Sequence, residues 1–498
     1  MPEQPEQPEQ PEQPEQPEQI EDKTDGPRGG APGAVDRFFR ISARGSTYAR
    51  EIRGGFATFF TMAYILVLNP IILGSAKDKF GDQLDPAQLV TVTALVAAVM
   101  TVIMGVGGNL PLALAAGLGL NAVVAFQIAP LMSWPDAMGL IFLEGLLICV
   151  LVVTGLREAV MHALPAALKH AISVGIGLFI AFIGFIDAGF ATRIPGDTGS
   201  VPVQLGLGGR LVGWPALVFC FGLLLTVALL ARKVRGAILV SIVVTTVLAV
   251  VIDGLADIKA AAWGLTEPSV PDDVVASPDF GLVGAFSPFG AFEQIGVITL
   301  VLLVFTLILS DFFDTMGTVV GISSEAGLLD ERGRVPNLGR VLLIDGAAAV
   351  AGGAASASSS TSYIESAAGV GEGARTGFAN LVTGSLFALA LFFAPLATVV
   401  PAQAAAPALV AVGFLLMAQV RYIDWERWDL AIPAFLTVVV MPFTYSITNG
   451  IGAGFLAYVV IKTVLGKARD VHWLLWGAAA LFLVYFAIDP LEQLLGVK

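Results

Sequence analysis

The chain has 498 residues, of which 56% are hydrophobic and only 13% are charged, and its mean hydropathy is +0.81. Soluble domains carry about 25% charged residues, so this composition excludes an ordinary globular enzyme and indicates an all-α polytopic protein embedded in a lipid bilayer. The net charge of −13 says little about partners because six of the acids belong to one N-terminal repeat, and no basic stripe suited to nucleic acid is present.

An acidic, proline-rich tract opens the chain: residues 2–19 are six copies of Pro-Glu-Gln. A tract of this kind cannot bury a core, so we predict that it is disordered. It has neither the basic start nor the apolar stretch of a signal peptide. We assign residues 1–45 to a cytoplasmic tail with little bearing on the central activity.

Beyond about residue 55, apolar segments of the length needed to cross a bilayer follow one another. The first seven lie near 56–76, 88–107, 113–128, 137–156, 168–186, 214–231 and 236–253. The second seven lie near 295–314, 340–355, 358–371, 375–395, 403–420, 429–446 and 449–466. We therefore predict fourteen transmembrane segments, seven in residues 46–255 and seven in residues 293–466. Residues 467–498 hold one more apolar stretch, 472–488, which is an extra span or an interfacial helix.

The charges of the loops predict the orientation. Five arginines between residues 37 and 53 precede the first segment, which places the N-terminus in the cytoplasm. Counting segments alternately puts the other basic loops on the same side. The long loop of residues 256–292 then lies outside, and its acids outnumber its single lysine. The pattern is typical of a multi-pass plasma-membrane protein, such as one of a bacterial inner membrane.

The two sets of seven segments are predicted to form an inverted repeat, since an odd number of segments makes the second half enter from the opposite side. The third segment of each half is short and rich in small residues, LALAAGLGLNAVVAF at 112–126 and SASSSTSYIESAAGVG at 356–371. Interrupted segments at matching positions are the best sequence indication of a transporter's central site. An offset of 244 positions pairs Asn121 with Glu365 and sends Asp311 to position 67 in the first segment.

Two acids, Asp311 and Glu365, stand within sequence that otherwise reads as membrane-spanning. A carboxylate in hydrocarbon costs at least a few kcal/mol, so such an acid predicts a functional site. The competing interpretation places each acid near a helix end, within reach of the headgroups. Asp314 shares a helical face with Asp311 and is a candidate neighbour. For Asp345, near the start of its segment, we expect a structural role, because acids are favoured at a helix N-terminus.

Glu144 is left open between function and pairing with a hydroxyl across a helix interface. The hydroxyl-rich run of residues 358–362 favours backbone that departs from a helix, because these side chains compete for backbone hydrogen bonds. A helix-packing face made of small residues would look the same.

A cavity with two carboxyls, an amide and several hydroxyls, but no Lys or Arg, suits a planar polar solute with ring N–H groups. It also suits proton coupling, because burial and a second carboxylate nearby both disfavour the charged form of a carboxyl. We expect one of Asp311 and Glu365 to carry the proton while the other holds the solute. Sodium is the competing ion, because oxygen ligands suit hard cations.

Enzymes and metal proteins are disfavoured, and we expect no cofactor. The sequence contains no HExxH, no P-loop and no Ser-His-Asp set. His162 and His170 are eight residues apart with no further ligand in zinc spacing, so no metal site is predicted. The remaining alternatives are an anion carrier of the same architecture and a channel or facilitator without proton coupling.

Four motifs together resemble one family: EIRGGFATFFTMAYILVLNPIIL, LAAGLGLNAVVAF, SDFFDTMGTVVG and TSYIESAAGVGEGARTG. They are similar to the AzgA-like adenine/guanine/hypoxanthine permeases, which belong with the uracil and xanthine permeases to the nucleobase–cation symporters. The resemblance runs from about Glu51 to the last apolar segment. It implies fourteen segments in two inverted sevens, with a core domain of segments 1–4 and 8–11 and a gate domain of segments 5–7 and 12–14.

The resemblance also implies import of a purine base by proton symport, with the base held between short strands and half-helices of segments 3 and 10. The residues it assigns to base binding are Glu365, Asp311, Asn121, Tyr363, Thr315 and Ser362, and those it assigns to proton coupling are Asp311, Glu365 and Asp314. Thr315 occupies the position at which related uracil carriers have a histidine. The third-segment motif departs from the usual Pro-Gly-Met-Gly-Leu-Asn, since residues 116–121 read AGLGLN. A homodimer is one assembly open to such a carrier.

Overall fold

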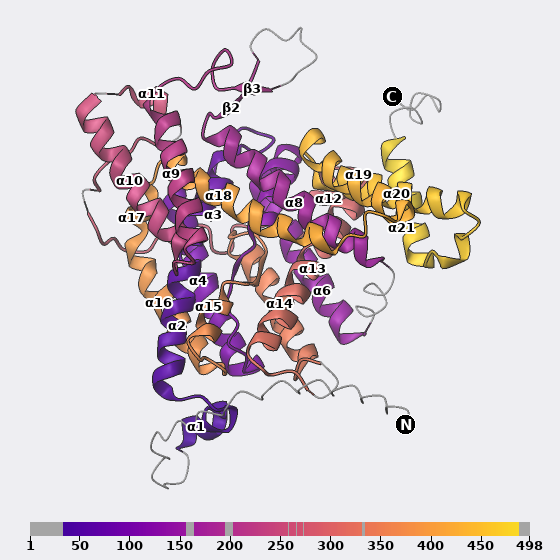
Figure 1. Cartoon of the computed structure of the whole chain (residues 1–498), viewed down its shortest axis with the longest axis horizontal. Coiled ribbons are helices and arrows are strands. Elements are labelled where there is room, and N and C mark those ends of the chain that lie inside the picture. The colour runs from indigo at the N-terminus through magenta and orange to yellow at the C-terminus, as the bar shows by residue number, and fades with distance from the viewer. Residues whose placement is uncertain are drawn as a thin grey trace, which may run out of the picture.

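The structure, a computed structural model, describes residues 33–155, 164–194, 203–256, 258–264, 266–271, 273–330 and 334–487. These residues form a mostly helical molecule with four short strands (Figure 1). The Pro-Glu-Gln repeats and His162 lie outside the described residues. The prediction of a helical, polytopic membrane protein is confirmed, because ten described helices are long and apolar enough to cross a membrane.

The elements of the first half are α1 (Ala34–Phe39), α2 (Tyr48–Met62), α3 (Ile65–Ser75), α4 (Pro86–Ile103), β1 (Leu114–Ala116), α5 (Leu118–Val123), α6 (Trp134–Val153), α8 (Ala166–Asp187), β2 (Ala191–Arg193), β3 (Val203–Leu205), α9 (Trp214–Ala231) and α10 (Ala237–Ala256). Those of the second half are α11 (Ala260–Trp263), α12 (Ala291–Gln294), α13 (Val297–Glu325), α14 (Leu338–Ala354), β4 (Ser360–Ser362), α15 (Ser366–Gly371), α16 (Phe378–Ala390), α17 (Ala394–Thr398), α18 (Ala402–Met417), α19 (Trp428–Thr444), α20 (Ile447–Val464) and α21 (Trp473–Phe486).

Local sequence determines where several helices begin. Asp85 caps α4 by accepting hydrogen bonds from two backbone N–H groups, and Pro86 occupies the first helical position. Ser133 caps α6 by accepting a hydrogen bond from the backbone N–H of Asp136, and Pro135 occupies the second helical position. Both patterns are favourable because the first N–H groups of a helix have no partner within it.

The predicted end of segment 8 at residue 314 is wrong, because α13 continues for eleven more residues to Glu325. Thr315, Thr318 and Ser323 are polar, which lowers the hydropathy, but all three are buried inside the protein. Asp311 and Asp314 consequently lie well inside the helix, which removes the interpretation that they sit near a helix end and reach the headgroups. The additional C-terminal stretch is α21, whose 14 residues span about 21 Å, less than the bilayer core.

Two short strands interrupt the helices where segments 3 and 10 were expected to be broken. β1 pairs with β4 in antiparallel register, with Ala115 opposite Thr361. Ser356 and Ser358 before β4 have positive φ values of 56° and 70°, so the serine run is not a helical packing face. Gly352 makes this path feasible, since a Cβ there would lie 2.0 Å from the carbonyl oxygen of Ser358.

The strand register corrects the repeat offset. Equivalent central residues of the two strands, Ala115 and Thr361, are 246 positions apart rather than 244. Past the strands the two halves differ further, because Glu365 is the N-cap of α15 whereas Asn121 lies within α5, after its N-cap Gly117. The pairing of Asn121 with Glu365 is therefore wrong, because the connections from strand to helix differ in length.

The described helices pack in two groups. In the first group, α6 packs on α14, α4 packs on α16, and α2 packs on both α15 and α16. In the second group, α8 packs on α18 and α19, α9 packs on α10 and α18, and α19 packs on α20. Figure 1 shows α19, α20 and α21 at one side of the molecule, and α10 and α17 at the other. Each group contains helices from both halves of the chain.

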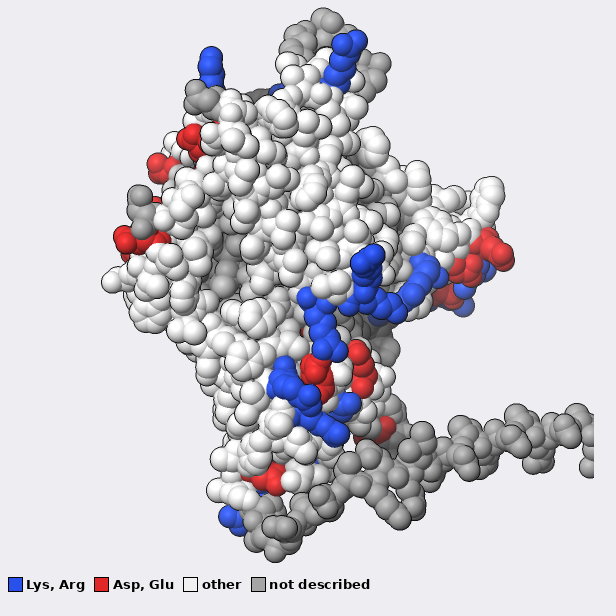
Figure 2. Space-filling model, turned by 60° about the vertical axis from the view of Figure 1, so that its left-hand side comes forward, with Lys and Arg blue, Asp and Glu red and all other residues white. Residues whose placement is uncertain are grey.

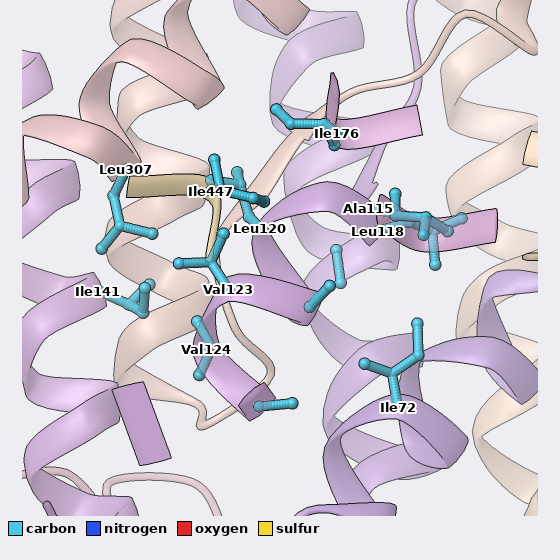
Figure 3. Close-up of a cluster of buried hydrophobic side chains, with 14 of the residues drawn as sticks. Ile72, Ala115, Leu118, Leu120, Val123, Val124, Ile141, Ile176, Leu307 and Ile447 are labelled. Atoms are coloured by element: carbon cyan, nitrogen blue, oxygen red, sulfur yellow. The ribbon is translucent and has the colours of Figure 1, made fainter. Parts of the chain in front are cut away.

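The molecular surface also reflects the membrane. Figure 2 shows a broad uncharged area between acidic side chains at the upper left and a cluster of Lys and Arg at the lower right. In the interior, apolar side chains gather around α5 (Figure 3). We call Leu120, Val123, Ile176, Leu307 and Ile447 the apolar plug; all five are buried and they come from α5, α8, α13 and α20.

Candidate binding cavity

A cavity of about 330 Å³ lies where the two helix groups meet. Its volume is at the lower end of the range for small-molecule sites. The start of α5, the middle of α13 and the link from β4 to α15 line one side, and α8 and α18 of the second group line the other. The lining residues are Tyr64, Gly117, Leu118, Gly119, Ser173, Asp314, Gly317, Thr318, Ser362, Tyr363, Ile364, Glu365, Val412, Leu415, Leu416 and Gln419.

Glu365 lies in this cavity at the N-cap position of α15. Its carboxylate accepts a hydrogen bond from the hydroxyl of Tyr64, which is fully buried at the break between α2 and α3. The Thr61 hydroxyl donates to the backbone carbonyl of Glu365 at 3.3 Å. Segment 1 thus fixes the position of the carboxylate on segment 10.

Asp314 is the α13 acid that lines the cavity, so the structure brings Asp314 and Glu365 together. Asp311 lies one helical turn earlier and is buried, and it is not among the described lining residues. The sequence selected both acids of α13 but could not tell which of them faces open space.

Asp345 links α14 to the cavity wall. Its two carboxylate oxygens accept hydrogen bonds from Thr315 Oγ1 at 2.6 Å and from Ser362 Oγ at 2.7 Å. Thr315 Oγ1 also lies 2.7 Å from Thr361 Oγ1. We expected Asp345 to be structural because acids are favoured at a helix N-terminus. That reason is wrong, because Asp345 is the eighth residue of α14 and therefore lies beyond the first turn. It instead joins α13 and β4 to α14.

Three other residues considered from the sequence differ in their surroundings. The Tyr363 side chain lines the cavity, and its hydroxyl donates to the Ala116 carbonyl at 2.5 Å, across the strand pair. Asn121 is fully buried on α5 outside the described lining, and its amide atoms have no hydrogen-bond partner among the described residues. Glu144 is fully buried on α6 beside the Ser359 hydroxyl.

Sequence reasoning missed Tyr64, Thr318, Ser173 and Gln419 as lining residues. Tyr64 carries the clearest signal, since it lies within the first-segment motif, which the predicted offset pairs with the region of Asp311. Ser173 and Gln419 belong to the second helix group, and no local pattern distinguishes them from ordinary interface residues.

The cavity is rich in acceptors. Among the described residues that line it there is no Lys, Arg or His, while two carboxyls, three hydroxyl residues, two tyrosines and one amide are present. This combination suits a neutral, planar solute with N–H donors and disfavours an anion. No group of three metal-ligating residues occurs in the described part of the chain.

The family described as the Permease family matches residues 49–487. The chain is 38% identical to the guanine/hypoxanthine permease PbuG of Bacillus subtilis, covering 90% of this chain and 98% of that one. It is 36% identical to the adenine permease AdeP of Escherichia coli, covering 91% and 96%, respectively.

Two solved structures share the fold. The transmembrane domain of a cyanobacterial bicarbonate transporter, BicA, superposes with a TM-score of 0.56 at 15% identity, covering 84% of this chain and 97% of that one. The structure of SLC26A9 superposes with a TM-score of 0.58 at 11% identity, covering 84% and 65%. At such identities these matches establish the architecture alone.

Proposed function

Because this chain belongs to the Permease family, we propose that it imports guanine, hypoxanthine and adenine across the plasma membrane by proton symport. That it is a multi-pass membrane permease, and no enzyme, follows from the family and from its relatives. The resemblance seen in its motifs is thereby confirmed. The substrates, the coupling ion and the roles of individual residues are the proposal.

We further propose fourteen segments in two inverted sevens with a cytoplasmic N-terminus. The packing supports this arrangement, because contacts recur when equivalent segments are exchanged. In the proposed repeat, segments 2 and 9 are equivalent, and so are segments 4 and 11. Segment 2 packs on segment 11 (α4 on α16), and segment 9 packs on segment 4 (α14 on α6). The pairs α9–α18 and α19–α8 recur in the same way. The first helix group corresponds to the core domain and the second to the gate domain.

One observation carries the proposed function: Asp314 and Glu365 line the same cavity, which has no cationic side chain among its described lining residues. A carboxylate accepts two parallel N–H bonds from guanine, through N1–H and the 2-amino group, and one N–H bond from the same edge of hypoxanthine, and charge strengthens both arrangements. Adenine lacks that donor pattern and requires a protonated carboxyl or an amide. We assign base binding to Glu365, with Ser362 and Tyr363 beside it.

We assign the coupling proton to the Asp314–Glu365 pair. Two carboxyls that face one cavity are hard to ionise together, so one of them holds a proton in at least one state of the carrier. We assign Thr315 a positioning role through its contacts with Asp345 and Thr361. We assign a positioning role as well to Asp311, which is buried one helical turn before Asp314 on α13.

The test is uptake of labelled hypoxanthine by proteoliposomes under an imposed pH gradient. The parent protein should accumulate the base with an acidic exterior and stop when the gradient is dissipated. Asp314→Asn should abolish accumulation but keep exchange, and Glu365→Gln should weaken hypoxanthine binding about tenfold or more. Asp424→Asn, an exposed acid in the loop before α19, is the matched control and should behave as the parent.

Other results would favour the alternatives. Equilibration of hypoxanthine that does not depend on the pH gradient would indicate a facilitator. Accumulation driven by a sodium gradient alone would identify sodium as the coupling ion. Uptake of an anion without base uptake would favour an anion carrier, and bicarbonate is the first anion to try because the structural neighbour BicA is a bicarbonate transporter.

A further inference from the structure

A second polar pocket lies beyond the apolar plug, and two helices give the same order of features. Along α5 and its continuation, residues 117–119 line the binding cavity, Leu120 and Val123 belong to the plug, and residues 126–127 line the second pocket. Along α13, Asp314 lines the cavity, Leu307 belongs to the plug, and residues 299 and 303 line the second pocket. The plug therefore lies between the binding cavity and the second pocket along both helices.

The second pocket has a volume of about 220 Å³ and lies between the two helix groups. Its lining residues are Phe126, Gln127, Leu131, Thr299, Leu303, Tyr445, Ser446, Thr448, Asn449 and Tyr485. Lys, Arg, Asp and Glu are all absent from this described lining, which favours a neutral occupant. The orientation proposed above puts the pocket on the extracytoplasmic side of the plug.

Two residues that line this pocket each carry a buried amide atom with no hydrogen-bond partner among the described residues. These atoms are Nε2 of Gln127 and Oδ1 of Asn449. Gln127 is held in place because its Oε1 accepts from Ser446 Oγ at 3.1 Å and from Thr448 Oγ1 at 3.4 Å. An unpaired buried donor or acceptor is costly, so this pair is suited to a ligand that presents one acceptor and one donor.

Aromatic side chains complete the pocket. Tyr445 has a left-handed backbone, with φ of 53°, at the C-cap of α19, a conformation that is unfavourable for a bulky residue. Its ring centroid lies 5.7 Å from that of Phe126 and 5.2 Å from that of Phe179. The strained turn thus places an aromatic ring from the second helix group against α5 of the first.

We propose that this pocket is an outer binding site, at which a neutral, planar nucleobase is held before the plug opens. Gln127 donates to a ring acceptor of the base, Asn449 accepts from an N–H group, and Tyr445 provides an aromatic face. The identity of the occupant rests on the proposed function, whereas the existence of the site rests on the pocket and its unpaired amides. Opening of the plug would connect this site to Glu365.

Thiol protection tests the site. In a protein with Cys149 and Cys220 replaced by Ala, Thr299→Cys introduces a thiol in the outer pocket and Leu307→Cys one in the plug. A membrane-impermeant maleimide added to right-side-out vesicles should modify the first much faster than the second. Saturating hypoxanthine should slow the modification of Thr299→Cys several-fold. If saturating hypoxanthine leaves the rate of modification of Thr299→Cys unchanged in vesicles that still take up hypoxanthine, the outer site is overturned and the proposed function is not.

A kinetic measurement supplies the second test. Asn449→Leu should raise KM for uptake from outside several-fold and leave hypoxanthine binding from the cytoplasmic side unchanged. Thr444→Val is the control, because Thr444 donates only to its own helix, at Val440, and does not line the pocket. An unchanged KM for Asn449→Leu overturns the outer site, whereas absence of uptake by the parent protein overturns the proposed function as well.

Discussion

At the scale of single residues, Glu365 and Asp314 line one cavity from two different helices. Glu365 is the N-cap of α15, and Asp314 lies in the interior of α13. The sequence singled out Glu365 and Asp311, because an acid in apolar surroundings needs a compensating environment, and it named Asp314 only as a neighbour of Asp311. It did not single out Tyr64, although this residue lies in the first-segment motif, because a tyrosine in an apolar run is more often a core residue. It expected a structural role for Asp345 but for the wrong reason, because the true start of α14 and the hydroxyl partners of Asp345 are visible only in three dimensions.

Removing the Tyr64 hydroxyl should weaken substrate binding. Tyr64→Phe deletes the donor to Glu365 and keeps the ring, and a hydrogen bond to a charged group is worth about 1.5 kcal/mol, so we expect roughly a tenfold loss of affinity for hypoxanthine. Calorimetric titration of the purified protein measures this loss. Tyr458→Phe, on α20 and outside the described lining of the cavity, is the matched control, and equal losses in both variants would contradict the role of Tyr64.

At the scale of elements, hydropathy located the long helices well and their ends poorly. Each of the ten long helices overlaps a predicted segment. The end of α13 was missed because its polar residues are buried inside the protein. A hydropathy pattern shows that a residue is polar but not whether it contacts protein, lipid or water. The strands were expected only through a resemblance, since three-residue strands leave no periodicity; their register, and the offset of 246 that it implies, required coordinates.

The contacts of Thr315 should stabilise the junction of α13, α14 and β4. Thr315→Val removes hydrogen bonds to Asp345 and Thr361 without changing the shape of the side chain, so we expect a loss of about 1–3 kcal/mol and a lower Tm. Thr306→Val, on the same helix, is the control, because the buried Thr306 hydroxyl has no partner among the described residues. A melting curve in detergent compares them, and an equal shift would show that the hydroxyl contacts are immaterial.

At the scale of the whole molecule, the two halves of the chain are interleaved. Both helix groups take members from each half, so neither half buries its own surfaces alone. The sequence predicted the repeat from its matched broken segments, but the choice of partners across the halves depends on surface shape. The outer pocket could not be predicted at all, because its residues come from segments distant in the sequence.

Cutting the chain between α11 and α12 should yield two dependent fragments. Expressed separately, each fragment should aggregate on extraction, because α4, α6, α14 and α16 would lose their partners. Expressed together, they should copurify through an affinity tag on one fragment and regain hypoxanthine uptake. A cut within α5 is the control and should abolish recovery. Monodisperse, stable single halves would contradict the interleaved packing.

The β1–β4 pair also has a consequence for biogenesis. When β1 leaves the ribosome, its partner strand is still some 246 codons from being translated. Until then the unpaired N–H and C=O groups of β1 are poorly tolerated in hydrocarbon, so the nascent first half must shelter that strand within the insertion machinery or in a hydrated crevice. Joining such distant partners is also slow, since closing so long a loop carries a large entropic cost. Completion of the binding cavity therefore belongs to the last stage of maturation, after the lipid-facing helices have already entered the bilayer.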